Sequence, residues 1–145
     1  KGKKIYDLLV GWEIEQKDRI VYENDFFVAF CPFVSKYPYE LRIFPKDGHA
    51  HFEKMPEALD TYLADIMSVV FRKLKKALNN PSYNFFIHTA SAKEDLENKF
   101  HEFYTWHLEI IPKLSMIGGF ELGTGVYVNI VDPDEAAKLL KETKI

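Results

Sequence analysis

The sequence has few of the features of secreted, membrane-embedded or nucleic-acid-binding proteins. Its 145 residues include one cysteine, Cys31, so neither an internal disulfide nor a cysteine-rich zinc site can form within the chain. No apolar stretch approaches the ~20 residues of a membrane-spanning helix. The net charge of −3 provides no basic surface for nucleic acid. We therefore expect a soluble cytoplasmic protein with neither a membrane nor a nucleic acid as partner.

Apolar residues are abundant and their spacing changes along the chain. They make up 47% of the sequence, enough for one domain spanning residues 1–145 to build its own core. The spacing predicts strands at residues 19–22, 26–30, 39–44, 83–89, 103–112 and 126–128. It predicts helices at residues 5–15, 56–78 and 133–142. Strands followed by a long helix and further strands indicate an α+β fold, in which helices pack on an antiparallel sheet.

The first helix is expected to be amphipathic, with Ile5, Leu8, Leu9 and Trp12 on its apolar face. Between residues 90 and 101 the sequence is charged and predicts a loop. The glycines between residues 118 and 125 likewise predict an irregular segment.

The segment from residue 103 to residue 112 contains the side chains best suited to chemistry. Side chains alternate along a strand, so we expect Trp106 to face the core and His107 and Glu109 to share the opposite, polar face. The imidazole and the carboxylate would lie ~6–7 Å apart, close enough to bind one ion or flank one phosphate. From this assignment, His107→Ala should leave the fold intact, whereas Trp106→Ala should cost about 3–5 kcal/mol.

A second histidine lies on a neighbouring predicted strand, residues 83–89. If this strand pairs antiparallel with residues 103–112, His88 meets His107 and Glu109. Two imidazoles and a carboxylate suit zinc or ferrous iron. The alternative is two ordinary histidines hydrogen-bonded near a sheet edge, and the residues alone leave both open.

Two loops contain residues that could bind a substrate. Lys46 and His49 follow a strand end, where they could hold a phosphate or a carboxylate, although a polar turn is the alternative. The stretch 118–125 lacks the lysine and hydroxyl residue that end a nucleotide P-loop. It could bend the backbone close to a ligand, with Glu121 accepting hydrogen bonds from sugar hydroxyls, or form a plain surface loop.

Several short stretches together resemble a known family. In chain order they are residues 19–24, 38–40, 43–46, 83–84, 106–112, 119–125, 129 and 133–137. They make most of the chain similar to the C-terminal half of galactose-1-phosphate uridylyltransferases and their relatives, which include ADP-glucose phosphorylase and belong to the histidine-triad superfamily. The resemblance implies a histidine-triad-like half-barrel, with the helix 56–78 across an antiparallel sheet and short terminal helices.

The resemblance also implies roles for the histidines. In these enzymes the second histidine of a His-Pro-His motif in the N-terminal half accepts the nucleotidyl group. His107 stands at the corresponding position, although this chain contains no His-Pro-His. Some relatives hold iron or zinc through three histidines of the C-terminal half, with a glutamate from the other half. His88 and His107 match two of these histidines; Thr105 occupies the third position, so Glu109 would have to replace that ligand.

The family also uses its glycine-rich segment to bind the hexose phosphate across a dimer interface. Carried over to this chain, Phe120 and Glu121 face the sugar, while Asn129, Lys46 and His49 are further substrate-binding candidates. The resemblance thus implies a homodimer that binds a nucleotide sugar and a hexose 1-phosphate.

Three functional hypotheses follow. The first is one half of a nucleotide-sugar nucleotidyltransferase, with the covalent histidine in another half. The second is a self-sufficient histidine-triad-like hydrolase or transferase that uses His107. The third is a non-catalytic metal- or nucleotide-binding module that dimerises.

Overall fold

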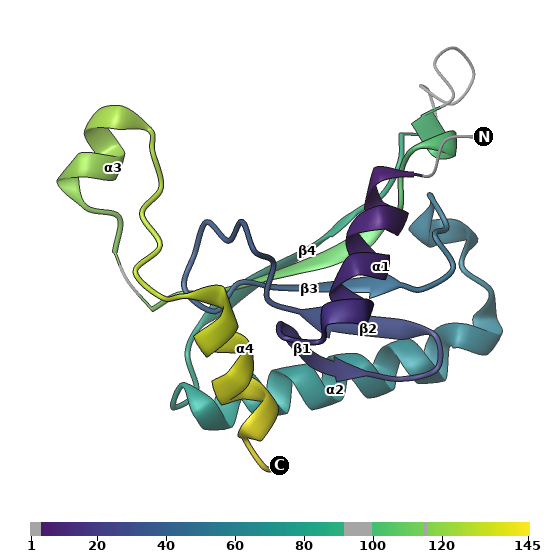
Figure 1. Cartoon of the computed structure of the whole chain (residues 1–145), viewed down its shortest axis with the longest axis horizontal. Helices are drawn as coiled ribbons and strands as arrows, with labels where there is room; N and C mark the ends of the chain where they lie inside the picture. Colours follow the sequence, from purple (N-terminus) through teal and green to yellow (C-terminus); the bar gives the residue numbers. More distant parts are fainter. Residues whose placement is uncertain (1–3, 92–99, 115) are drawn as a thin grey trace.

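The computed structural model describes residues 4–91, 100–114 and 116–145 (Figure 1). The predicted loop at residues 90–101 lies largely outside the described residues. The helices and strands, in chain order, are α1 (Ile5–Gln16), β1 (Ile20–Glu23), β2 (Phe27–Phe30), β3 (Leu41–Pro45), α2 (Asp60–Ala77), β4 (Tyr83–His88), β5 (His107–Pro112), α3 (Gly119–Thr124) and α4 (Pro133–Glu142).

The strands form one antiparallel sheet in the order β1-β2-β3-β5-β4. Helices α2 and α4 pack on one face, and α1 crosses the other (Figure 1). This arrangement confirms the predicted α+β fold. Strand β2 lies between the two layers, and its four side chains are buried, as its unbroken apolar run predicts.

The larger core lies between the sheet and α2. The apolar stripe predicted for the long helix is present, because Leu63, Ile66, Val70 and Leu74 are buried against the sheet. Trp106 is fully buried in the same core, which confirms the face assigned to it. The predicted cost of Trp106→Ala stays a prediction.

A second, smaller apolar cluster lies beneath α1. Its buried members are Val10, Ile20, Val28, Phe30 and Phe44. The predicted helix is therefore present, but its predicted apolar face is wrong, because Ile5, Leu8 and Trp12 are largely exposed. The helix instead turns Val10 and Glu13 towards the sheet, where the buried Glu13 carboxylate accepts from Arg19 Nε at 3.1 Å.

Three further segments differ from prediction in where they begin or in their type. Strand β5 begins at His107 rather than residue 103, because the Trp106 N–H donates to the His49 carbonyl and not to a neighbouring strand. Residues 126–128 are not a strand, since the Val128 N–H donates to Glu121 Oε1. The glycine-rich segment contains the short helix α3, which projects away from the sheet (Figure 1).

Helices α2 and α4 are joined by a buried lysine. Lys73 Nζ donates to the carbonyls of Leu140, Lys141 and Thr143 at 2.8–2.9 Å, at the C-terminal end of α4. These carbonyls lie where a helix leaves its acceptors unsatisfied, so an ammonium group suits the position. None of the described helices is long and apolar enough to span a bilayer.

A candidate metal and sugar-phosphate site

The pairing of β4 with β5 brings three potential ligands together. His88 lies opposite His107, and Phe86 lies opposite Glu109, so the two histidines and the glutamate share one face. One potential ligand atom from each of His88, His107 and Glu109 lies within 4.8 Å of the others. The antiparallel pairing expected from the sequence is therefore confirmed.

His107 is held in one tautomer by the backbone. Its Nδ1 lies 3.1 Å from the Thr105 carbonyl, which can only accept, so Nδ1 carries the proton and Nε2 keeps a free lone pair. Burial lowers the pKa of His107 to about 4, the hydrogen bond to Thr105 opposes that shift, and nearby His88 and Arg42 add to it. The imidazole is therefore neutral at pH 7, as metal ligation requires.

The face predicted to be polar and open around His107 is instead covered, while the predicted effect of His107→Ala on the fold stays a prediction. His107 is 4% exposed, and its ring contacts Tyr6 of α1 at a centroid distance of 5.3 Å. Thr105 Oγ1 donates to Asp7 Oδ1 of the same helix at 3.2 Å. Phe44 and α1 thus exclude water from His107, while His88 is 39% exposed.

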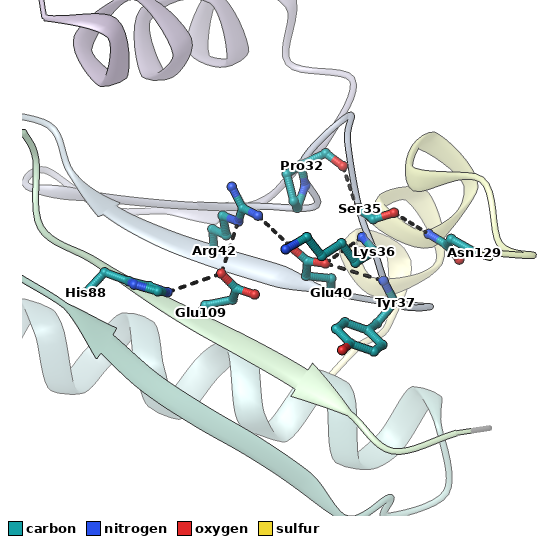
Figure 2. Close-up of polar contacts among 9 residues, drawn as sticks. All are labelled: Pro32, Ser35, Lys36, Tyr37, Glu40, Arg42, His88, Glu109 and Asn129. Carbon is teal, nitrogen blue, oxygen red and sulfur yellow. Dashed lines mark hydrogen bonds and ion pairs between the residues drawn. The ribbon is translucent and has the colours of Figure 1, made fainter. Parts of the chain in front are cut away.

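Glu109 links the histidines to an ion-pair network on β3. His88 Nε2 lies 3.4 Å from Glu109 Oε2, and Arg42 Nε lies 3.7 Å from the same oxygen. Arg42 Nη2 donates to Glu40 Oε1 at 2.8 Å. Figure 2 shows this series of contacts running from His88 through Glu109 and Arg42 to Glu40, and on to the backbone of Lys36 and Tyr37.

One pair of atoms in the cluster has the spacing expected of tetrahedral metal ligands. Ligand atoms bound at about 2.1 Å lie roughly 3.4 Å apart, which is the separation of His88 Nε2 and Glu109 Oε2. His88 Nε2 is buried and has no hydrogen-bond partner among the described residues. Two imidazoles and a carboxylate could therefore hold a zinc or ferrous ion, with a position open for a further ligand.

Lys46 and His49 occupy separate positions on the loop after β3. Lys46 Nζ lies 2.8 Å from Glu23 Oε2 and 2.7 Å from the Asn24 carbonyl, at the turn between β1 and β2. The His49 ring is half-exposed and lies 3.0 Å from Asp47 Oδ2. Both side chains are therefore engaged with protein groups.

The other proposed sugar contacts lie on residues 118–130, which include α3 and are here called the α3 segment. Phe120 is 60% exposed. Glu121 Oε2 accepts from the Gly118 N–H at 2.6 Å, which closes the first turn of α3. Asn129 Nδ2 contacts the Ser35 carbonyl at 3.4 Å, on the loop between β2 and β3 (Figure 2). Within one chain, Figure 1 shows α3 projecting away from the sheet that carries the histidine cluster.

The sequence reasoning missed Glu40 and Arg42. Glu40 directly precedes β3 and Arg42 lies on it; their alternation with Leu41 carries the signal, because it places both on the face shared by Glu109. Arg42 pairs directly across the sheet with Glu109, and only the register of β3 against β5 reveals that pairing.

Comparison with known proteins assigns the chain to a family. The family described as galactose-1-phosphate uridyl transferase, C-terminal domain, matches residues 2–144. The chain belongs to this family. The chain is 36% identical over 133 residues to ADP-glucose phosphorylase of Arabidopsis thaliana, covering 92% of the chain and 37% of that relative. It is 31% identical over 141 residues to galactose-1-phosphate uridylyltransferase of Thermotoga maritima, covering 92% of the chain and 43% of that relative.

The domain spans less than half the length of these relatives. A crystal structure of an Arabidopsis thaliana ADP-glucose phosphorylase with bound ADP-glucose superposes with a TM-score of 0.84 at 34% identity, covering 94% of the domain and 44% of that chain. A zinc-bound histidine triad family protein from Mycobacterium smegmatis superposes with a TM-score of 0.62 at 17% identity, covering 96% of this chain and 91% of that protein. This second likeness concerns the fold, and it confirms the histidine-triad-like architecture.

Proposed function

We propose that this domain is the C-terminal half of a nucleotide-sugar nucleotidyltransferase and supplies contacts to a hexose 1-phosphate. In this proposal the histidine that accepts the nucleotidyl group belongs to another half, and residues 1–145 act as one domain. Membership of the family supports the reaction class, and the similarity to an ADP-glucose phosphorylase supports a nucleotide sugar as ligand.

The environment of His107 is the observation that carries the proposal. A nucleophilic imidazole must approach the α-phosphate in line, with its reactive nitrogen open to the substrate. The His107 ring is instead enclosed between the rings of Phe44 and His88, at centroid distances of 4.5 and 4.7 Å. This enclosure favours a ligand role for His107 over a covalent one.

A metal held by His88, His107 and Glu109 is part of the proposal. A zinc or ferrous ion bound there would supply a rigid link between β4 and β5 or a Lewis acid. His107 is already oriented for this role, because its Nδ1 proton is fixed on the Thr105 carbonyl and its Nε2 is free. Glu109 Oε2 lies 3.4 Å from His88 Nε2 and 3.7 Å from Arg42 Nε, with a hydrogen bond to neither nitrogen.

We further propose that the α3 segment binds the hexose phosphate within a homodimer. Phe120 offers an exposed ring, and Glu121 retains free lone pairs for sugar hydroxyls beside its bond to the Gly118 N–H. Lys46, His49 and Asn129 are secondary contacts. A cytoplasmic location belongs to the same proposal, and the buried free thiol of Cys31 fits a reducing compartment.

Two measurements on the purified chain test this function. Saturation-transfer NMR should detect binding of glucose 1-phosphate or galactose 1-phosphate, and Glu121→Gln should weaken it at least about tenfold through loss of a charge-assisted hydrogen bond. Glu57→Gln removes an exposed carboxylate on the turn before α2 and should leave binding unchanged. Intact-mass spectrometry after incubation with UDP-glucose or ADP-glucose should find no nucleotidyl adduct. Sugar-phosphate binding that is absent, or unaffected by Glu121→Gln, would contradict the proposal.

The second candidate function is a self-sufficient histidine-triad-like transferase or hydrolase. The free lone pair on His107 Nε2 favours it, because the same tautomer prepares a nucleophile. A nucleotidyl adduct that forms on the isolated chain and is absent from His107→Ala would establish this function over the first.

A further inference from the structure

Arg42 occupies an unusual position beside the proposed metal ligands. Its Nη2 donates to Glu40 Oε1 at 2.8 Å, and its Nε points to Glu109 Oε2 at 3.7 Å, too far for a hydrogen bond. Arg42 is 21% exposed, Glu109 is 12% exposed and Glu40 is fully buried. The guanidinium therefore lies between two carboxylates in a setting where water screens charge weakly.

The buried Glu40 keeps the guanidinium in place. Glu40 Oε2 accepts from the backbone N–H groups of Lys36 at 2.8 Å and Tyr37 at 3.4 Å, while Glu40 Oε1 accepts from Arg42 (Figure 2). If Arg42 turned away, Glu40 would remain a buried carboxylate without a cation, which is strongly unfavourable. The side chain able to move in this network is thus Glu109 and not Arg42.

We propose that Arg42 is a positioning residue that competes with a divalent metal for Glu109 and thereby weakens metal binding by the cluster. The inference rests on the metal site proposed above, and it adds the residue that sets the affinity of that site for a metal ion. A metal at His88 and His107 needs the charge and a lone pair of Glu109 Oε2, the oxygen that Arg42 Nε faces. The fixed positive charge of Arg42 repels the metal ion and neutralises part of the negative charge that Glu109 would offer to it.

The same contacts couple metal binding to the loop between β2 and β3. When Glu109 moves to a metal, Arg42 retains only Glu40, whose second oxygen holds the amides of Lys36 and Tyr37. Asn129, on the segment after α3, contacts the Ser35 carbonyl of that loop. A metal bound to the cluster therefore changes the ion pairs that hold the loop between β2 and β3. The same loop contacts Asn129 of the proposed sugar-binding segment.

Zinc affinity of the metal-free chain, measured by competition with a chromophoric chelator, tests the inference. Arg42→Met should tighten zinc binding by about 10–100-fold, the range typical of outer-sphere changes at metal sites. Because Arg42→Met alone leaves Glu40 without a cation, the double variant Glu40→Gln/Arg42→Met is measured beside it. Arg42→Lys keeps the positive charge and should retain the native affinity. Arg72→Met, an exposed arginine on α2, is the matched control.

The absorption spectrum of bound cobalt(II) reports whether the same ligands are used. It should show a tetrahedral site in Glu40→Gln/Arg42→Met that disappears when His88→Ala is added. Equal zinc affinity in native protein, Arg42→Met and the double variant, all folded by circular dichroism, would overturn the competition and leave the metal site standing. Tighter binding in Arg42→Lys would also overturn it. Absence of zinc binding in every variant would refute both the metal site and the inference.

Discussion

The imidazole of His107 stacks on the ring of Phe44, with centroids 4.5 Å apart and planes inclined by 18°. Phe44 belongs to the apolar cluster beneath α1, so the contact places a titratable ring against a dry surface. A charged imidazolium would lose its hydration there, which is the main cause of the low pKa of His107.

We predict that the metal-free protein loses stability as the pH falls from about 6.5 to about 4. Over this range the unfolded chain protonates His107 while the folded chain does not, so protons bind preferentially to the unfolded state. With a folded pKa of about 4 for His107, the loss in free energy of unfolding reaches on the order of 3 kcal/mol, and it is absent above pH 7. Urea unfolding in the presence of a chelator, at pH 7.5 and pH 4.5, measures it.

His107→Gln supplies the comparison for the pH prediction, because glutamine does not titrate. Its stability should fall less between the two pH values than that of the native chain. Identical pH profiles for the native protein and His107→Gln would show that His107 does not carry the effect.

A second prediction concerns the lysine that joins α2 to α4. Lys73→Met should lower the free energy of unfolding by about 2–3 kcal/mol, because three carbonyls at the end of α4 lose a charged donor. Lys75→Met removes an exposed lysine from the same helix and should change stability by less than about 0.5 kcal/mol. Denaturant titration at neutral pH measures both, and equal losses would refute the role assigned to Lys73.

A third prediction concerns self-association through the α3 segment. Leu122 and Ile130 are 74% and 83% exposed, so large apolar side chains project from this segment into solvent. If the proposed homodimer uses them, Leu122→Glu/Ile130→Glu should convert the dimer to monomer with little change in thermal stability. Sedimentation velocity measures the change, and Ile5→Glu is a control at an exposed apolar residue on α1. A dimer that survives the double substitution would place the interface elsewhere.

The elements with strong periodicity were predictable from the sequence. Helix α2 carries a stripe at helical spacing, and β2 is an unbroken apolar run, so each matched its predicted type and burial. The clustering of His88, His107 and Glu109 was also predictable, because they alternate on two strands for which antiparallel pairing suffices to bring them together.

The surroundings of the site were not predictable in the same way. The orientation of α1 depends on the buried pair Glu13 and Arg19, which no hydrophobic pattern reveals, and that orientation buries His107. The role of Arg42 depends on the register of β3 against β5. Both are side-chain relationships set by tertiary packing, and local propensity carries no information about them.

The two sides of the sheet have separate apolar clusters, and this separation bears on how His107 can be reached. Helix α1 rests on the smaller cluster, while the larger one holds α2 and α4. A helix anchored on a small cluster can detach at a free energy well below that of complete unfolding. Chemical modification of His107 in the native protein should therefore report the opening of α1, with the rest of the sheet remaining protected from hydrogen exchange.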